Sequence, residues 1–347
     1  MKTVPIFVSI LVVLVASGAS ARTWHILPDG SGDAPTIKAG IDSAAAGDTV
    51  VAACGTYFES GLEMKSDLVL VSETGSADCA TIDAEWHDRA LACQDCNGTA
   101  EIIGFTITHG RPPGGQTRRG GGMLLTASSA TVKGCTFVDN AAEYGAGALC
   151  SGGSSVFTGC AFLNGQGEVG AGVFCEYSNP AINGCVFAGN ISVSVGTVYC
   201  RESSPSIVNC TFYGNMANFG SGVGCGAFSS PQIENTIISY STFGEAFSCG
   251  TESYPRLTCC DVFGNVDGDW AGCVSSQNGA DGNISADPRF CDAADGDFTL
   301  ESCSPCLPGN HPDGYDCGGI IGVLGSGCEC ATATEPTTWG AIKALHK

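Results

Sequence analysis

The chain has 347 residues, of which 50 are glycine and 22 are cysteine, and its formal net charge is −21. Only 14 Lys and Arg stand against 35 Asp and Glu, so most of the surface would repel a polyphosphate, which argues against nucleic acid as a partner. The glycines follow no Gly-X-Y period, which excludes collagen and indicates many tight turns.

The first residues have the pattern of a bacterial-type signal peptide. Lys2 precedes an apolar run from Val4 to Ala16, and Ala19-Ser20-Ala21 has the small-x-small form of a cleavage site. The run is shorter than the ~20 apolar residues of a membrane-spanning helix, and no later segment qualifies. We therefore predict a signal peptide over residues 1–21, no transmembrane segment, and a mature protein that is secreted or displayed on the cell surface.

The entry segment contains Leu27-Pro-Asp-Gly-Ser-Gly-Asp33, Thr36-Ile37 and Ala46-Gly47-Asp48-Thr49-Val50. It is similar to the start of pectin-lyase-like β-helix proteins. In those proteins a short helix, here expected at about residues 36–45, covers the open end of the coil. Such a cap is needed because exposed strand edges otherwise recruit another chain.

A 25-residue repeat fills the middle of the chain, most clearly over residues 100–265. Three series carry it: Cys135, Cys160, Cys185 and Cys210; Phe137, Phe162, Phe187 and Phe212; and Cys150, Cys175, Cys200 and Cys225. A fixed period of this size indicates stacked units that cannot bury their apolar faces alone. The frame positions hold Cys, Phe, Val and Ile in short runs between Gly, Asn and Ser, which favours three strands per coil over a leucine-rich repeat.

The predicted fold class is therefore all-β: a right-handed parallel β-helix of about 25 residues per coil over residues 22–290. In such a coil, equivalent residues lie about 4.8 Å apart. Asn140, Asn190, Asn215 and Asn265 are then expected to form a turn ladder, interrupted at Gly165, that bonds the neighbouring coil. A second bend with little room for side chains is expected at Gly122, Gly147, Gly172 and Gly222, with Thr197 as its exception.

The cysteine series allow two interpretations. The distance between coils falls within the Cα window of a disulfide, so neighbours such as Cys150 and Cys175 could be joined. Alternatively, the thiols stay free as small buried apolar groups. We favour buried stacking with some bridging, and disulfides over metal for Cys93-Gln-Asp-Cys96 and Cys303-Ser-Pro-Cys306.

The repeats resemble those of the chlamydial polymorphic outer membrane proteins, which combine F-x-x-N with a G-G-A-[ILV] element. The counterparts here are Phe137-Val-Asp-Asn140, Phe187-Ala-Gly-Asn190 and Phe212-Tyr-Gly-Asn215, with Gly145-Ala-Gly-Ala-Leu149 and Gly170-Ala-Gly-Val-Phe174 as glycine elements. This resemblance implies a cell-surface protein.

The end of the chain differs in composition from the repeats. Asp287-Pro-Arg-Phe290, Gly296-Asp-Phe-Thr-Leu300 and Gly319-Ile-Ile-Gly322 are similar to the closing segment of many secreted bacterial β-helix proteins. We expect a Cys-rich C-terminal cap over residues 291–330. Residues 331–347 are expected to form a Thr/Ala/Pro-rich linker and a short tail that either docks elsewhere or frays.

Two carboxylates are the candidate catalytic groups. Glu143 and Glu168 are 25 residues apart, so they are expected side by side on adjacent coils, close enough to share a proton or a cation. The alternative is two solvated turn residues. Glu176 and Arg201 are also one coil apart and are expected to form a surface ion pair.

Two further groups are candidate ligand contacts. The spacing from Phe105 to Phe137 exceeds one period, so Arg111, Arg118 and Arg119 are expected in a basic excursion that either binds a partner or merely loops out. Phe174 and Tyr199 follow Leu149 at one coil position and form either an exposed strip for sugar stacking or part of the core.

No cofactor and no metal site are predicted, although calcium stays possible because Asn265-Val-Asp267-Gly-Asp269 has part of a calcium-loop pattern. Pectin-lyase-like folds include lyases, hydrolases and esterases for acidic polysaccharides, but neither the calcium-carboxylate pattern of pectate lyases nor the aspartate–arginine pattern of pectin methylesterases is found in this sequence. We therefore expect a non-catalytic adhesive or glycan-binding protein with an extracellular glycan or surface partner. The alternative is a polysaccharide lyase or glycoside hydrolase.

Overall fold

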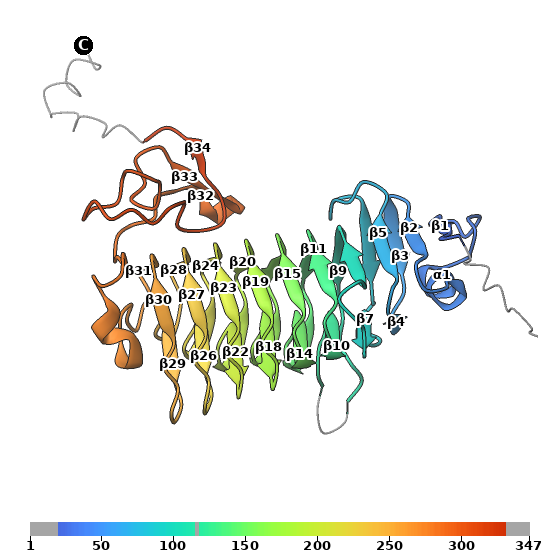
Figure 1. Ribbon diagram of the computed structural model, residues 1–347, viewed down its shortest axis with the longest axis horizontal. Coiled ribbons are helices and arrows are strands. Elements are labelled where there is room, and N and C mark those ends of the chain that lie inside the picture. The colour runs from blue at the N-terminus through green and yellow to red at the C-terminus, as the bar shows by residue number, and fades with distance from the viewer. Residues whose placement is uncertain (1–19, 115–117, 331–347) are drawn as a thin grey trace, which may run out of the picture.

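The computed structural model describes residues 20–114 and 118–330. The chain winds into a rod of stacked coils, and each coil strand pairs in parallel with the equivalent strand of the next coil (Figure 1). The helix content is confined to short segments, so the all-β solenoid fold expected from the repeat is confirmed. Residues 1–19 of the predicted signal peptide and the predicted tail, residues 331–347, lie outside the described residues.

Three long sheets form the walls of the rod. Sheet A consists of β1 (Thr23–Ile26), β2 (Thr49–Ala52), β5 (Val69–Ser72), β8 (Glu101–Ile103), β11 (Thr131–Lys133), β15 (Val156–Thr158), β19 (Ala181–Asn183), β23 (Ser206–Val208), β27 (Gln232–Glu234) and β30 (Arg256–Thr258). Sheet B consists of β3 (Gly55–Phe58), β6 (Ala80–Asp83), β9 (Phe105–Thr108), β12 (Thr136–Val138), β16 (Ala161–Leu163), β20 (Val186–Ala188), β24 (Thr211–Tyr213), β28 (Ile237–Ser239) and β31 (Asp261–Phe263). Sheet C consists of β4 (Leu62–Met64), β7 (Leu91–Gln94), β10 (Met123–Ser128), β14 (Ala148–Gly153), β18 (Val173–Glu176), β22 (Val198–Arg201), β26 (Val223–Cys225) and β29 (Phe247–Cys249).

The middle coils contain a fourth strand, where the sequence predicted only three. Sheet D consists of β13 (Ala141–Tyr144), β17 (Gln166–Val169), β21 (Ile191–Val195) and β25 (Met216–Phe219). It lies between sheets B and C in each coil. Its strands follow the asparagine turn, and the outward face of this short sheet carries the candidate functional site.

The predicted register is confirmed in the middle coils. Cys150, Cys175, Cys200 and Cys225 are paired in sequence across sheet C, and Phe137, Phe162, Phe187 and Phe212 across sheet B. The four phenylalanine rings stack with centroids 4.9, 4.8 and 4.5 Å apart. All four are buried, so one column of rings fills the interior along successive coils.

The asparagine ladder satisfies backbone groups inside the turn. Asn190 is fully buried; its Oδ1 accepts the N–H of Gly165 at 2.9 Å, and its Nδ2 donates to the carbonyl of Phe162 at 2.8 Å. Asn215 makes the equivalent contacts one coil on. The residues with positive φ are those just before the ladder, such as Asp139 and Gly189, and not the asparagines themselves.

The second bend is as narrow as the glycine series predicts. A Cβ on Gly147 would lie 2.5 Å from the carbonyl oxygen of Gly172 and 2.7 Å from the Phe162 ring. The sheet B phenylalanines therefore pack directly against this bend, and glycine is needed here for space.

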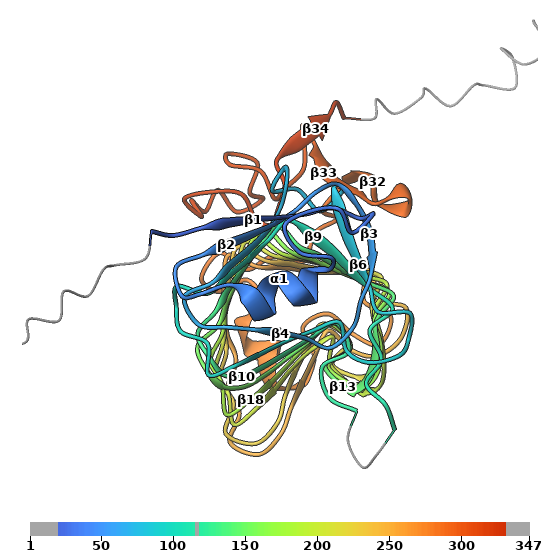
Figure 2. The ribbon, with the colours of Figure 1, turned by 90° about the vertical axis from the view of Figure 1, so that its right-hand side faces the viewer.

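The N-terminal cap is also confirmed. Helix α1 (Ile37–Ser43) begins after Thr36, whose hydroxyl accepts the N–H of Ala39 at 3.0 Å. Ile37 and Ile41 are buried, and Figure 2 shows α1 lying across the open end of the coil. The helix thus covers the apolar interior that the first coil would expose.

The cysteines divide between bridges and free thiols. Six disulfides join Cys54–Cys79, Cys93–Cys96, Cys249–Cys273, Cys259–Cys317, Cys291–Cys328 and Cys303–Cys330. The eight cysteines of the two predicted series are all free and buried, so the suggested bridge between Cys150 and Cys175 is absent. The second C-x-x-C pair is also not bridged internally, because Cys303 bonds Cys330 and Cys306 is free. This many disulfides indicates an oxidising, extracellular environment.

The rod ends in a C-terminal module, here residues 285–330, that folds back along the side of the last coils (Figure 1). It contains β32 (Phe290–Asp292), the 3₁₀ turn η2 (Ala293–Asp295), β33 (Asp297–Glu301) and β34 (Ser326–Cys328) and follows the 3₁₀ turn η1 (Gly272–Gln277). Its apolar core joins Ile284, Leu300, Cys306 and Ile321 to Ile237 of sheet B. Within the described residues, no helix has the length and apolar character needed to cross a membrane.

Candidate functional site

A surface groove of about 870 Å³ lies on the outward face of sheet D. Its walls come from segments far apart in the sequence: Trp86 after β6, Arg111 and Arg118 in the excursion between β9 and β10, and residues of β13, β17 and β21. Figure 2 places β13 at a corner of the coil, beside this excursion. The groove therefore brings the two candidate carboxylates together with part of the basic excursion.

The two candidate carboxylates both line the groove. In the pairing of β13 with β17, Ala142 lies opposite Gly167 and Tyr144 opposite Val169, which puts Glu143 beside Glu168. Ala142 is buried, so by strand alternation Glu143 faces outward. The carboxylate of Glu143 accepts the backbone N–H of Arg118 at 3.1 Å, which anchors the excursion to the floor of the groove.

Arg111 and Arg118 supply positive charge on the opposite wall. Among the residues that the structure describes, neither guanidinium forms an ion pair with a carboxylate, whereas Arg89, Arg119 and Arg201 do. Two guanidinium groups thus face the groove with their hydrogen-bond donors available to a ligand.

Arg119 does not project from the excursion as expected. Its guanidinium pairs with Glu176, whose other carboxylate oxygen accepts from Arg201 at 3.2 Å. Glu176 is buried, so the predicted pair with Arg201 exists but is not a surface pair. The excursion is held against sheet C because a buried carboxylate at this position needs cationic partners.

Phe174 and Tyr199, expected either as an exposed strip or as part of the core, do not form an exposed strip. Phe174 is only 2% exposed, and Tyr199 is half-buried. Their rings stack at 5.6 Å, and the Tyr144 ring covers Phe174 at 5.6 Å. The side chains do point away from the coil interior, but sheet D and its left-handed glycine turns, such as Gly170, lie over them. Phe174 is therefore inaccessible to a ligand in this conformation.

Sequence reasoning missed a histidine–aspartate pair at the rim of the groove. His109 Nδ1 lies 2.9 Å from Asp83 Oδ1, and the ring centroid of His109 is 4.8 Å from that of Trp86. Trp86 itself is 46% exposed and lines the groove. The pair positions the indole, since His109 packs against it and the carboxylate fixes the imidazole.

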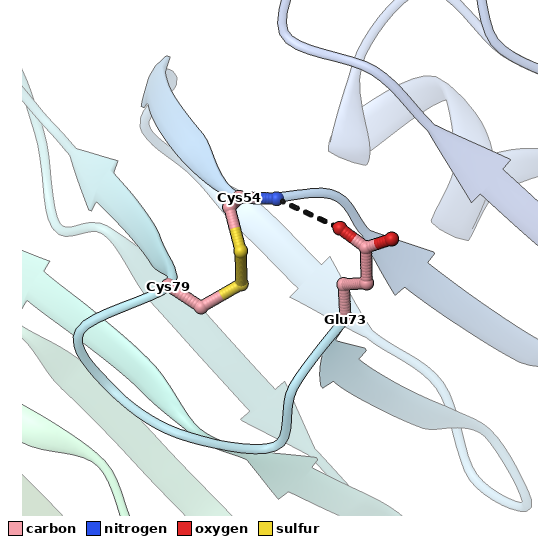
Figure 3. Close-up of side chains that lie close together, drawn as sticks. All are labelled: Cys54, Glu73 and Cys79. Carbon is pink, nitrogen blue, oxygen red and sulfur yellow. Dashed lines mark hydrogen bonds between the residues drawn. A yellow bond between two sulfur atoms is a disulfide. The ribbon is translucent and has the colours of Figure 1, made fainter.

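Two clusters have the donor atoms of a metal site, but disulfides occupy them. Figure 3 shows one of these, in which Cys54 and Cys79 are joined and Glu73 accepts the N–H of Cys54 at 3.4 Å. The other combines Glu301 with the Cys303–Cys330 disulfide. Sulfurs in a disulfide are not thiolate ligands. In the suggested calcium loop, Asp269 accepts the N–H of Asn265 at 2.8 Å and Asp267 that of Gly244 at 2.8 Å, so both carboxylates serve turns.

A comparison with protein families agrees with this fold. Residues 121–285 match the family model described as "Right handed beta helix region". The crystal structure of pectate lyase Pel9A is similar with a TM-score of 0.42 and 14% sequence identity, covering 89% of this chain and 98% of that chain. No curated protein matches the sequence. Together with the parallel register of every coil, the family match makes the middle of this chain a right-handed parallel β-helix.

Proposed function

We propose that this protein is a secreted or cell-surface β-helix protein that binds an extracellular glycan in the groove on sheet D. The observation that carries the proposal is the convergence of an exposed indole, two guanidinium groups and two carboxylates on one concave surface. The volume of about 870 Å³ lies within the range of small-ligand sites.

Each of these groups has a role in binding a sugar. Trp86 offers an aromatic face on which the C–H face of a pyranose can stack. Glu143 and Glu168 accept hydrogen bonds from hydroxyl groups, and the planar forks of Arg111 and Arg118 donate to hydroxyl or carboxylate oxygens. Glu143 and Glu168 stand on paired strands of sheet D, so their relative positions are set before the ligand arrives and little ordering entropy is lost there.

A second candidate function is glycan cleavage, which the spacing of the two carboxylates favours. In-register neighbours on paired strands are separated by about 4.8 Å along the rod. Retaining glycosidases use two carboxyl groups about 5–5.5 Å apart, one as acid/base and one as nucleophile. Glu143 and Glu168 lie on such neighbouring positions.

A binding panel of neutral and acidic oligosaccharides, followed by isothermal titration calorimetry of the hits, tests the proposal. We expect Trp86→Ala and the double variant Glu143→Gln/Glu168→Gln each to weaken binding at least tenfold. Phe58→Ala is the matched control, because Phe58 is 65% exposed and does not line the groove. Equal affinity of the Trp86 variant and the control for every hit would refute the groove as the binding site.

The same panel separates binding from cleavage. Products are measured by mass spectrometry after long incubation, with and without calcium. Turnover that is lost in both Glu143→Gln and Glu168→Gln would establish the enzyme and overturn the non-catalytic proposal. Binding without products supports the glycan-binding function.

A further inference from the structure

The C-terminal module rests on an acidic residue at the end of sheet B. Asp261 begins β31 and lies opposite Ile237 in the pairing with β28. In the earlier coils this outward position holds Thr136, Ala161, Val186 and Thr211. The module covers the position, so Asp261 is 0% exposed.

The contacts of Asp261 come from the module and from the segment that leads into it. Its Oδ1 accepts the N–H of Ala286 at 3.0 Å, and its Oδ2 accepts from the thiol of Cys306 at 3.2 Å. Both donors are neutral. Asp261 has no ion-pair partner among the residues that the structure describes.

The other titratable groups around Asp261 are acidic. They are Tyr240 after β28, Cys260 before β31, Asp269 in the loop after β31, Asp287 at the start of the module, and Cys306 within it. Each is neutral or negatively charged at neutral pH. A negative charge on Asp261 is therefore both desolvated and repelled, and the two hydrogen bonds from Ala286 and Cys306 offset this only in part.

Burial raises the pKa of Asp261 to about 7, with repulsion from Asp269 and Asp287 adding to the effect. An exposed aspartate titrates near pH 4. Between these two values the docked module retains a proton that the undocked module releases. Docking is therefore tightest below about pH 4, weakens progressively as pH rises to about 7, and changes little above that.

We propose that the C-terminal module is a pH-released clasp, in which ionisation of Asp261 loosens the contact between residues 302–322 and the last coils. The Cys259–Cys317 disulfide keeps this segment attached when the contact opens. Opening uncovers Ile237 of sheet B and Ile321 of the module, which belong to one apolar core. The clasp is independent of the glycan groove on sheet D.

Cys306 is a built-in probe of this motion, because its thiol is free, buried and in contact with Asp261. The experiment alkylates the full chain with N-ethylmaleimide between pH 5 and 8.5 and quantifies the Cys306 peptide by mass spectrometry. Dividing the wild-type rate by the rate in Asp261→Asn at each pH removes the intrinsic pH dependence of the thiol. We expect this ratio to rise nearly tenfold per pH unit at first, by about fiftyfold in all from pH 5 to 7, and then to level off.

Cys210, which is buried in a central coil, serves as the control for global unfolding. It should stay unmodified throughout. A flat ratio for Cys306, or equal modification of Cys210, would overturn the clasp. Asp287→Asn gives an independent test if Asp261→Asn fails to fold. Asp287→Asn removes a negative charge near Asp261 and should lower the pKa of Asp261. The alkylation rate of Cys306 should then stop rising at a lower pH than in the wild type, and an unchanged pH profile would also contradict the proposal.

Discussion

Replacing Asn190 with alanine tests whether the asparagine ladder holds the coils together. The substitution replaces a buried polar side chain with a smaller apolar one, so the main change is the loss of its hydrogen bonds. The N–H of Gly165 loses its acceptor and the carbonyl of Phe162 loses a donor. Both groups lie inside the turn, where water does not replace the missing partner.

The cost follows from the hydrogen bonds that are lost. The Gly165 N–H is left buried without a partner, which costs about 1–3 kcal/mol, and the Phe162 carbonyl, which also lies in the β16–β20 ladder, loses one hydrogen bond, which costs about 0.5–1.5 kcal/mol. Asn179→Ala is the matched control, because its exposed carboxamide accepts one N–H, from Ser204 at 2.6 Å. Water can solvate that N–H after the substitution, so we expect the control to cost less than about 1 kcal/mol.

Equilibrium unfolding in guanidinium chloride, followed by far-ultraviolet circular dichroism, measures both variants against the wild type. The midpoint of Asn190→Ala should fall well below that of Asn179→Ala. If the two midpoints coincide, the buried ladder contributes no more than a surface hydrogen bond, and the asparagines do not hold the coils together.

Three further predictions concern the bend, the thiols and the excursion. Gly147→Ala should lower the free energy of unfolding by about 1–3 kcal/mol, because the added Cβ meets the Gly172 carbonyl and the Phe162 ring. In the same denaturation assay, the control Gly319→Ala should be near neutral, because its Cβ would meet no atom within 4 Å. Burial raises the pKa of the Cys225 thiol to about 12, so at pH 8 only about one molecule in ten thousand carries the thiolate, and iodoacetamide should leave Cys225 unmodified until the rod unfolds. Rapid modification of the native protein would contradict this. Glu176→Ala should speed trypsin cleavage after Arg118 and Arg119, because Arg119 loses the carboxylate that holds the excursion. The control Glu202→Ala, at an exposed glutamate, should not. Equal digestion rates of the two variants would show that Glu176 does not anchor the excursion.

The fold was readable from the sequence because equivalent residues of a regular coil recur at one spacing. Phe162 and Phe187 are paired as their 25-residue separation predicts, and α1 lies within residues 36–45, where a capping helix was expected. Sheet D could not be predicted from the sequence. Segments such as Gln166–Val169 show no alternation of polar and apolar residues and are not rich in β-branched residues, so nothing in them indicates a strand. Its presence explains why neither alternative for Phe174 describes the structure, since the ring points outward but lies beneath another sheet.

The candidate site was predictable only in part. The spacing of Glu143 and Glu168 was sufficient to place them together, because both lie in the regular middle coils. The pairing of His109 with Asp83 was not readable, since His109 lies one residue beyond β9 in a left-handed turn, where the strand register does not fix the direction of the side chain. The position of Asp261 could have been noticed in the sequence. It aligns with Ile237 at an outward position of sheet B, and the other middle coils hold Thr, Ala or Val there, so an aspartate stands out.

The two series of free cysteines, which stack along successive coils, restrict how this protein can be produced. Eight free thiols are buried in the interior, while the disulfides join residues toward the two ends of the rod. An unfolded chain would offer all of them to the oxidant at once, and wrong partners would far outnumber right ones. Successive coils must therefore assemble before oxidation is complete, so that folding itself chooses which sulfurs remain available. Production in an oxidising compartment should consequently depend on the rate of coil assembly more than on the supply of disulfide isomerase.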